Sequence, residues 1–194
     1  MGGYGVIDLA KLAMEKTAFH FFANHFSYPE KNPFTVEPVA ELFAPSHPAY
    51  ADVKQYWDMM QSMPLDDLQI NYANLFDFQE DATLFMTYVK YEDSKERGQM
   101  LARLKVFYEM FGLTTVDGEL TDLLPLMCEF IYAVEWEDDP RAKQGFNLLF
   151  AIIEDGTYHL MNALEKYESP YYFLVKGLRE TCKACLTQKE VASE

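Results

Sequence analysis

The sequence predicts an all-α protein, a single-domain helical bundle that extends over residues 1–194. Three observations lead to this fold class. Apolar residues recur at three- and four-residue steps, alternating runs of β-branched residues are absent, and prolines divide the chain into helix-sized segments. We therefore expect seven to nine helices packed around one core.

The first expected helix covers residues 7–26, and its apolar side chains fall mostly three or four positions apart. Tyr28-Pro29 ends it, because the residue before a proline is disfavoured in the α region. The frequent prolines between 29 and 48 predict loops around one short helix. Further helices are expected over 49–62, 65–76, 81–90, 141–166 and 170–186.

Residues 94–111 carry the clearest amphipathic pattern, and Gly112 is a natural C-terminal cap for that helix. Asp117-Gly118 then predicts a turn. Asp122 can cap the next helix, with Pro125 tolerated in its first turn. The apolar stripe consists of Met100, Leu101, Leu104, Phe107, Tyr108 and Phe111.

Composition limits the possible partners. The chain is 49% hydrophobic, which excludes a disordered protein, and its net charge of −15 repels nucleic acid and anionic lipid. A basic partner is the electrostatic complement. No apolar run approaches the roughly 20 residues that span a bilayer, and residues 1–8 lack the basic start of a signal peptide. With only three cysteines, these features predict a cytoplasmic protein.

The acidic residues are unevenly distributed. Residues 55–89 and 106–140 contain many acids but no lysine or arginine. One interpretation is a solvated acidic face. However, large apolar residues such as Trp57, Phe130 and Trp136 are interleaved with these acids. An acidic rim around aromatic pockets suits a peptide that carries arginines and apolar side chains.

Motifs for catalysis or metal binding are missing. A di-metal carboxylate bundle needs Glu-x-x-His pairs, and none precedes the four histidines. Cys182 and Cys185 form a CxxC, but only Cys128 remains as a further thiol, so we interpret the pair as ordinary helix residues. Phosphate-binding and nucleophile-elbow motifs are also absent. We therefore expect no enzyme activity, no metal and no cofactor.

Several short motifs, in order, resemble the NarJ family of nitrate reductase assembly chaperones, within the TorD/DmsD-like group of molybdoenzyme chaperones. The family's Glu-Leu-Pro-Asp-His-Leu-Pro appears here as residues 119–125, with Thr121 for the first proline and Leu123 for the histidine. That histidine position is linked to leader-peptide binding in related chaperones. The other pieces are Tyr28-Pro29, Pro64-Leu65-Asp66, Tyr72 with Leu75-Phe76, Arg97-Gly98-Gln99-Met100, and Ser169-Pro170-Tyr171.

The resemblance implies an all-helical protein without catalysis of its own. It implies a partner, the apo catalytic subunit of a molybdoenzyme, and nitrate reductase is the client that the motif form favours. Such chaperones bind the subunit's N-terminal segment, a twin-arginine leader or its remnant. They hold the subunit open for molybdenum cofactor insertion before membrane docking. The acidic composition points separately to a basic peptide, and we expect a monomer or weak homodimer.

The peptide is expected to meet an apolar groove with acidic residues around it. Tyr72, Leu75 and Phe76 share one helix face, because they are three and four positions apart. This face can also be plain core, and Asp122 can be a helix cap only. The full expected set is Tyr72, Leu75, Phe76, Asp77, Glu119, Asp122, Pro125 and Glu129.

Three other functions remain open from sequence. The client can be another molybdoenzyme, such as a sulfoxide or N-oxide reductase. The chain can instead be a metal-dependent helical-bundle enzyme, or a regulatory helical adaptor that has no part in cofactor insertion.

Overall fold

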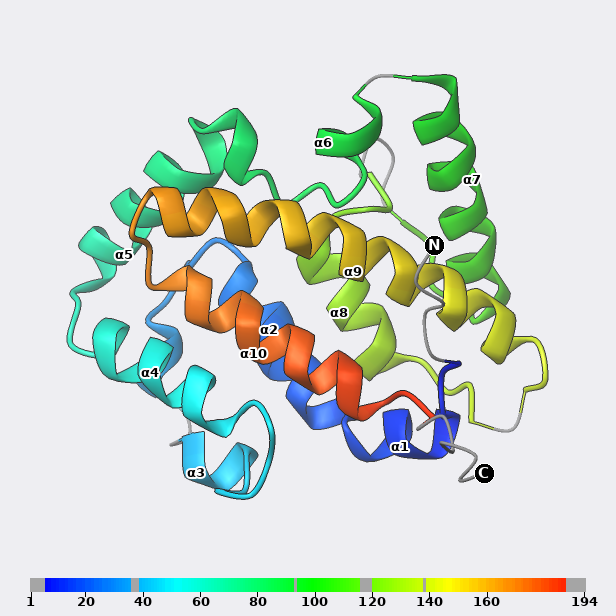
Figure 1. The fold of residues 1–194 in the computed structure, drawn as a ribbon, viewed down its shortest axis with the longest axis horizontal. Coiled ribbons are helices and arrows are strands. Elements are labelled where there is room, and N and C mark those ends of the chain that lie inside the picture. Colours follow the sequence, from blue (N-terminus) through cyan, green and yellow to red (C-terminus); the bar gives the residue numbers. More distant parts are fainter. Residues whose placement is uncertain (1–5, 36–38, 93, 116–119, 138, 188–194) are drawn as a thin grey trace, which may run out of the picture.

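The computed structural model describes residues 6–35, 39–92, 94–115, 120–137 and 139–187. These residues form one helical bundle (Figure 1), which confirms the predicted all-α class. The long helix α9 (Ala142–Lys166) crosses the molecule, with α10 (Tyr171–Ala184) beside it. Helices α2 (Lys16–Phe26) and α8 (Leu124–Ala133) pack together behind them in that view.

The other helices surround this centre. Helices α5 and α4 lie at one end in Figure 1, whereas α6 and α7 form an arm at the other end. The remaining α-helices are α1 (Leu9–Met14), α3 (Val39–Leu42), α4 (Tyr50–Met60), α5 (Leu65–Tyr72), α6 (Tyr88–Tyr91) and α7 (Lys95–Met110). The short segments are the 3₁₀ turns η1 (Pro33–Thr35) and η3 (Glu80–Ala82), and the π-helix η2 (Ala73–Asp77).

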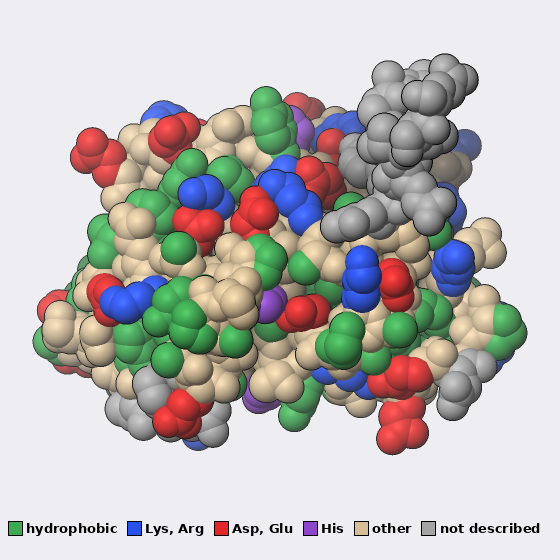
Figure 2. Space-filling model, turned by 60° about the horizontal axis from the view of Figure 1, so that its bottom comes forward, with side chains coloured by type: hydrophobic (Ala, Val, Ile, Leu, Met, Phe, Trp, Pro, Cys, Tyr) green, Lys and Arg blue, Asp and Glu red, His purple; other side chains and the backbone are tan. Residues whose placement is uncertain are grey.

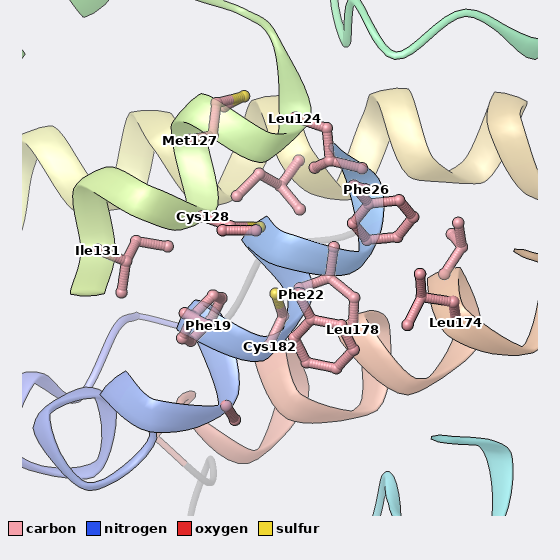
Figure 3. Packing of buried hydrophobic residues seen from close by; sticks show 14 of the residues in the cluster. Phe19, Phe22, Phe26, Leu124, Met127, Cys128, Ile131, Leu174, Leu178 and Cys182 are labelled. Carbon is pink, nitrogen blue, oxygen red and sulfur yellow. The ribbon is translucent and has the colours of Figure 1, made fainter. Parts of the chain in front are cut away.

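The core lies where α2, α8 and α10 meet (Figure 3). Phe19, Phe22 and Phe26 come from one face of α2 and are inaccessible to solvent. They point toward Cys128 of α8 and Leu178 of α10. Burying an aromatic or aliphatic side chain of this size contributes about 1.5–3 kcal/mol, so this apolar stripe fixes the position of α2.

Most predicted helices are confirmed. The segments expected over 49–62, 94–111, 141–166 and 170–186 are helical, and 29–48 holds loops around the short helix α3. Gly112 follows α7 with φ of +83°, the left-handed conformation that favours glycine at a helix C-terminus. Pro125 occupies the first turn of α8. The Asp117-Gly118 turn lies outside the described residues.

The helix expected over 7–26 is divided in two, which helps raise the number of described α-helices to ten instead of seven to nine. Asp8 caps α1 by accepting hydrogen bonds from the amides of Ala10 and Lys11. The chain changes direction at Glu15, whose carboxylate lies 3.0 Å from the His47 ring. This contact between α1 and the segment before α4 accompanies the break.

The helix expected over 81–90 is wrong. Only its two ends are helical, and Phe85 instead forms an isolated antiparallel bridge with Leu123. The amide of Met86 donates to the Asp122 carbonyl, and the amide of Leu124 donates to the Leu84 carbonyl. Because Leu84 and Met86 are both buried, the segment follows a two-residue period that matches extended chain.

Candidate functional site

Four tyrosines from distant parts of the chain form what we call the tyrosine cluster: Tyr28, Tyr56, Tyr72 and Tyr171. The ring of Tyr28 meets that of Tyr72 edge-on at 5.6 Å between centroids, and Tyr171 lies 6.4 Å from Tyr72 and 5.6 Å from Tyr56. The Tyr72 hydroxyl donates to the Phe26 carbonyl at 2.9 Å. Burial raises the pKa of Tyr72, so the hydroxyl stays a neutral donor.

The helix that carries Tyr72 ends in a π-helical turn. Helix α5 stops at Tyr72 and continues as η2, in which one turn is wider than in an α-helix. Leu75 is buried, and the half-buried Phe76 lies 4.8 Å from the Tyr72 ring and 4.9 Å from that of Tyr171. The predicted trio of Tyr72, Leu75 and Phe76 therefore lies together. Isolated π turns occur frequently at functional sites.

Exposed apolar and acidic residues lie near this turn in the sequence. Phe78 is 74% exposed and Ile70 is 59% exposed. Asp77 and Glu80 are exposed beside Phe78 in sequence, and neither forms an ion pair with the described residues. We call Ile70, Phe76, Asp77, Phe78 and Glu80 the α5–η2 surface. Sequence reasoning missed Ile70 and Phe78, because their exposure depends on how α5 packs.

Acids of the two cation-free stretches meet cations from elsewhere in the chain. Asp81 accepts from Lys166 at 2.9 Å, and this contact holds the pKa of its carboxyl below the usual range. Glu137 likewise pairs with Lys16 at 2.8 Å. On the face drawn in Figure 2, acidic and basic side chains are interspersed with apolar ones. Among the described residues, Asp77 and Glu80 form no ion pair, and the same holds for the exposed Asp66 and Asp67 of α5.

Asp122 is not at a peptide-facing position. Its carboxylate is inaccessible to solvent and accepts from the Thr87 amide at 3.1 Å and from Arg97 at 3.4 Å. The Thr87 hydroxyl also donates to Asp122 and accepts from Arg97 Nε at 3.1 Å. Asp122 does not cap α8 either, because Leu123 occupies that position. We call Thr87, Arg97 and Asp122 the ion-pair cluster, and it joins the segment before α6 to α7 and to the start of α8.

The other predicted residues are dispersed. Pro125 is buried in α8, and Glu119 lies outside the described residues. Glu129 is partly exposed on α8, with its carboxylate 3.6 Å from the His20 ring. That ring stacks on Tyr132 at 4.1 Å.

The two positions where the 119–125 motif departs from its family form have structural roles here. The Thr121 hydroxyl donates to the Leu101 carbonyl, and its own carbonyl accepts from the Tyr108 hydroxyl. Leu123 supplies the bridge to Phe85. Thr121 therefore attaches α7 to the segment before α8, and Leu123 attaches the segment before α6.

Searches of the described residues for other kinds of site give two negative findings. Nowhere in that part of the chain do three or more histidine, cysteine or acidic side chains gather in a way that could hold a metal ion. The helices in the described ranges also include none that is long and apolar enough to span a membrane.

The sequence comparison identifies the family to which this helical bundle belongs. Residues 44–174, more than half of the chain, match the family described as nitrate reductase delta subunit. The protein belongs to this family, which confirms the resemblance to the NarJ group.

Relatives carry names that describe assembly proteins. The chain is 35% identical over 108 residues to the probable nitrate reductase molybdenum cofactor assembly chaperone NarJ of Bacillus subtilis, covering 56% of this chain and 55% of the relative. It is 28% identical over 131 residues to the probable chaperone NarW of Escherichia coli, covering 68% and 54%. The aligned region thus spans about half the length of these relatives. Their names designate chaperones instead of catalysts, in agreement with the expectation for this chain.

Proposed function

We propose that the protein is an assembly chaperone for a respiratory nitrate reductase, and that it binds the basic N-terminal peptide of the apo catalytic subunit in the cytoplasm. Family membership supports the chaperone role. The bound peptide, a twin-arginine leader or its remnant, marks a subunit that awaits its molybdenum cofactor. Binding delays membrane docking until the cofactor is inserted.

The observation that carries this proposal is the α5–η2 surface. Phe78 and Ile70 offer apolar area that nothing in the described chain covers, and Phe76 offers part of its ring. Asp77 and Glu80 provide carboxylates without a cationic partner among the described residues. An amphipathic peptide that carries arginines complements both properties, because arginine forms charge-assisted hydrogen bonds with carboxylates.

The client that we propose is a nitrate reductase. The relatives are named for nitrate reductase, and this supports a nitrate reductase client over a sulfoxide or N-oxide reductase. In this proposal the chaperone catalyses no reaction and needs no cofactor of its own. It acts by binding the client peptide and by delaying membrane docking.

The test is a calorimetric titration of the purified protein with synthetic N-terminal peptides from candidate catalytic subunits. We expect one peptide, that of the nitrate reductase client, to bind at least tenfold more tightly than peptides from unrelated molybdoenzymes. Its affinity should fall as salt rises, because exposed charges are screened beyond about 8 Å at physiological ionic strength. If all candidate peptides fail to bind, the proposed function is wrong.

A charge-neutral variant localises the contact. Asp77→Asn together with Glu80→Gln should weaken binding and flatten its salt dependence, with unfolding free energy unchanged within about 0.5 kcal/mol. The matched control, Glu96→Gln with Glu109→Gln on α7, removes the same number of exposed charges far along the sequence. Equal weakening in both variants would mean that only net charge matters, and not this surface.

A further inference from the structure

A pocket opens beside the tyrosine cluster, between α2, α4 and the segment 27–33. Its volume is about 910 Å³, and we call it the α2–α4 pocket. Phe21 and Trp57 form aromatic walls, with centroids 6.4 Å apart and nearly parallel rings. Leu42 closes one side and Tyr28 another. The space is large enough for a bulky side chain together with neighbouring backbone.

One wall carries a neutral hydrogen-bonding group. His25 lines the pocket although it is only 5% exposed, and its Nδ1 lies 3.2 Å from the Tyr56 hydroxyl. No hydrogen bond joins its other ring nitrogen to the described residues. Burial lowers the pKa of His25 to about 3, so the ring is uncharged at neutral pH. This wall of the pocket is therefore uncharged, and Thr17, Asn24 and Ser27 add polar groups to the lining beside the aromatic ones.

The charged residues Glu30 and Lys31, both exposed, also line the pocket. His20, which also lines it, stands 3.6 Å from the Glu129 carboxylate. The partly exposed Glu129 can receive a cation, and the net charge of −15 favours a basic ligand over an acidic one.

The pocket and the α5–η2 surface are physically connected. Tyr28 lines the pocket and packs edge-on against Tyr72, which in turn contacts Phe76. Inside the protein, Tyr171 contacts both Tyr56, the partner of His25, and Phe76. A peptide that lies on the α5–η2 surface can thus reach the pocket across Tyr28.

We propose that the α2–α4 pocket anchors one large apolar side chain of the client peptide, while a basic neighbour of that residue contacts Glu129. This inference rests on the proposed function and assigns it a specificity pocket. Aromatic walls favour a ring or a long aliphatic chain, because offset and edge-to-face contacts between rings add to the free energy of burial. The α2–α4 pocket would thus select peptides by the size and apolarity of one side chain. The α5–η2 surface would select them by charge.

Trp57 is a built-in reporter for this proposal. The chain has two tryptophans, and Trp136 is 1% exposed, with its indole N–H donating to the Ile131 carbonyl. Intrinsic fluorescence is therefore measured during titration with the peptide identified by calorimetry. We expect a shift in emission that is lost in Trp57→Phe and lost when the peptide's large apolar residue is replaced by alanine.

A second variant places an obstacle in the pocket. Leu42→Lys extends a cation into the space and should weaken peptide binding at least tenfold. Met14→Lys, at a position 75% exposed, adds the same charge elsewhere and should bind as wild type does. Thermal unfolding of both variants establishes that each remains folded.

The outcomes separate the two proposals. Peptide binding with a Trp57 signal and a weakened Leu42→Lys variant supports the pocket. Peptide binding by calorimetry with unchanged Trp57 emission and an unimpaired Leu42→Lys variant overturns the pocket while the proposed function stands. No binding by any candidate peptide overturns both.

Discussion

The tyrosine cluster and the ion-pair cluster contain motifs of the same family resemblance, yet they differ in what they offer to a partner. In the first, Tyr28, Tyr72 and Tyr171 meet beside a surface where Phe78 is 74% exposed. In the second, Arg97 and Asp122 meet where Asp122 has no exposed area. Tyr72, Tyr171, Arg97 and Asp122 are all buried, so the difference lies in what surrounds each cluster: the tyrosine cluster borders an exposed apolar surface.

The ion-pair cluster stabilises a long-range connection. It joins three segments that are distant in sequence, the residues before α6, the start of α7 and the residues before α8. The tyrosine cluster instead supports an outer surface, because the Tyr72 hydroxyl is hydrogen-bonded to the Phe26 carbonyl and its ring packs edge-on against Phe76. We therefore expect substitutions in the ion-pair cluster to lower stability and leave peptide affinity unchanged. Substitutions on the α5–η2 surface should do the opposite.

The largest expected effect concerns the ion-pair cluster. Asp122→Ala removes a buried carboxylate that accepts from the Thr87 amide, the Thr87 hydroxyl and Arg97, and should lower the unfolding free energy by about 3–5 kcal/mol, measured by urea denaturation. Asp155→Ala, which removes the exposed partner of Lys90, should cost about 0–1 kcal/mol. The folded fraction of Asp122→Ala should keep its peptide affinity. An Asp122→Ala protein with wild-type stability that no longer binds the peptide would contradict the structural role of Asp122.

The next effect is the pH dependence of stability that arises from His25. Its folded pKa of about 3 lies below the ordinary value of 6.5, so the unfolded chain binds the proton first as pH falls. The stability that neutral His25 contributes is complete above pH 6.5 and is lost progressively toward pH 3, by about 3 kcal/mol at pH 4. His25→Phe should lose correspondingly less stability over this range. Parallel stability profiles for the two proteins would contradict the burial of a neutral ring.

A glycine at the attachment of the α6–α7 arm gives a smaller effect. A Cβ at Gly156 would lie 2.5 Å from the Met86 carbonyl oxygen, so Gly156→Ala should destabilise by about 1–3 kcal/mol. Gly98 has open space around it on α7. Gly98→Ala should therefore stabilise by about 0.5–1 kcal/mol, because alanine is the better helix residue. Chemical denaturation of the two variants measures both changes in unfolding free energy. An unchanged unfolding free energy for Gly156→Ala would mean that the α6–α7 arm is loosely attached.

Much of the fold could be predicted from sequence because its periodicity is local. The stripe of α7 and the glycine cap at Gly112 are visible in a few residues. The segment 83–87 could not be predicted in the same way. Its partner is Leu123, so the extended conformation depends on a contact that is distant in sequence.

The candidate site was predictable only in part for a similar reason. Spacing brought Tyr72 and Phe76 together correctly. It gave no information on whether a carboxylate is exposed, and so Asp122 and Asp77 looked alike in the sequence although only Asp77 is exposed. The α2–α4 pocket combines α2, α4 and two loops, and no local pattern marks it.

The most direct measurement is the peptide affinity of Phe78→Ser, determined by calorimetry beside its unfolding free energy. Phe78 is 74% exposed, so its replacement should leave stability nearly unchanged. If the peptide buries this ring, the variant loses about 1.5–3 kcal/mol of binding free energy, roughly 10- to 100-fold in affinity. Tyr158→Ser, at a position 58% exposed on α9, is the matched control and should bind normally. Wild-type affinity in Phe78→Ser would contradict the central claim that the α5–η2 surface receives the peptide.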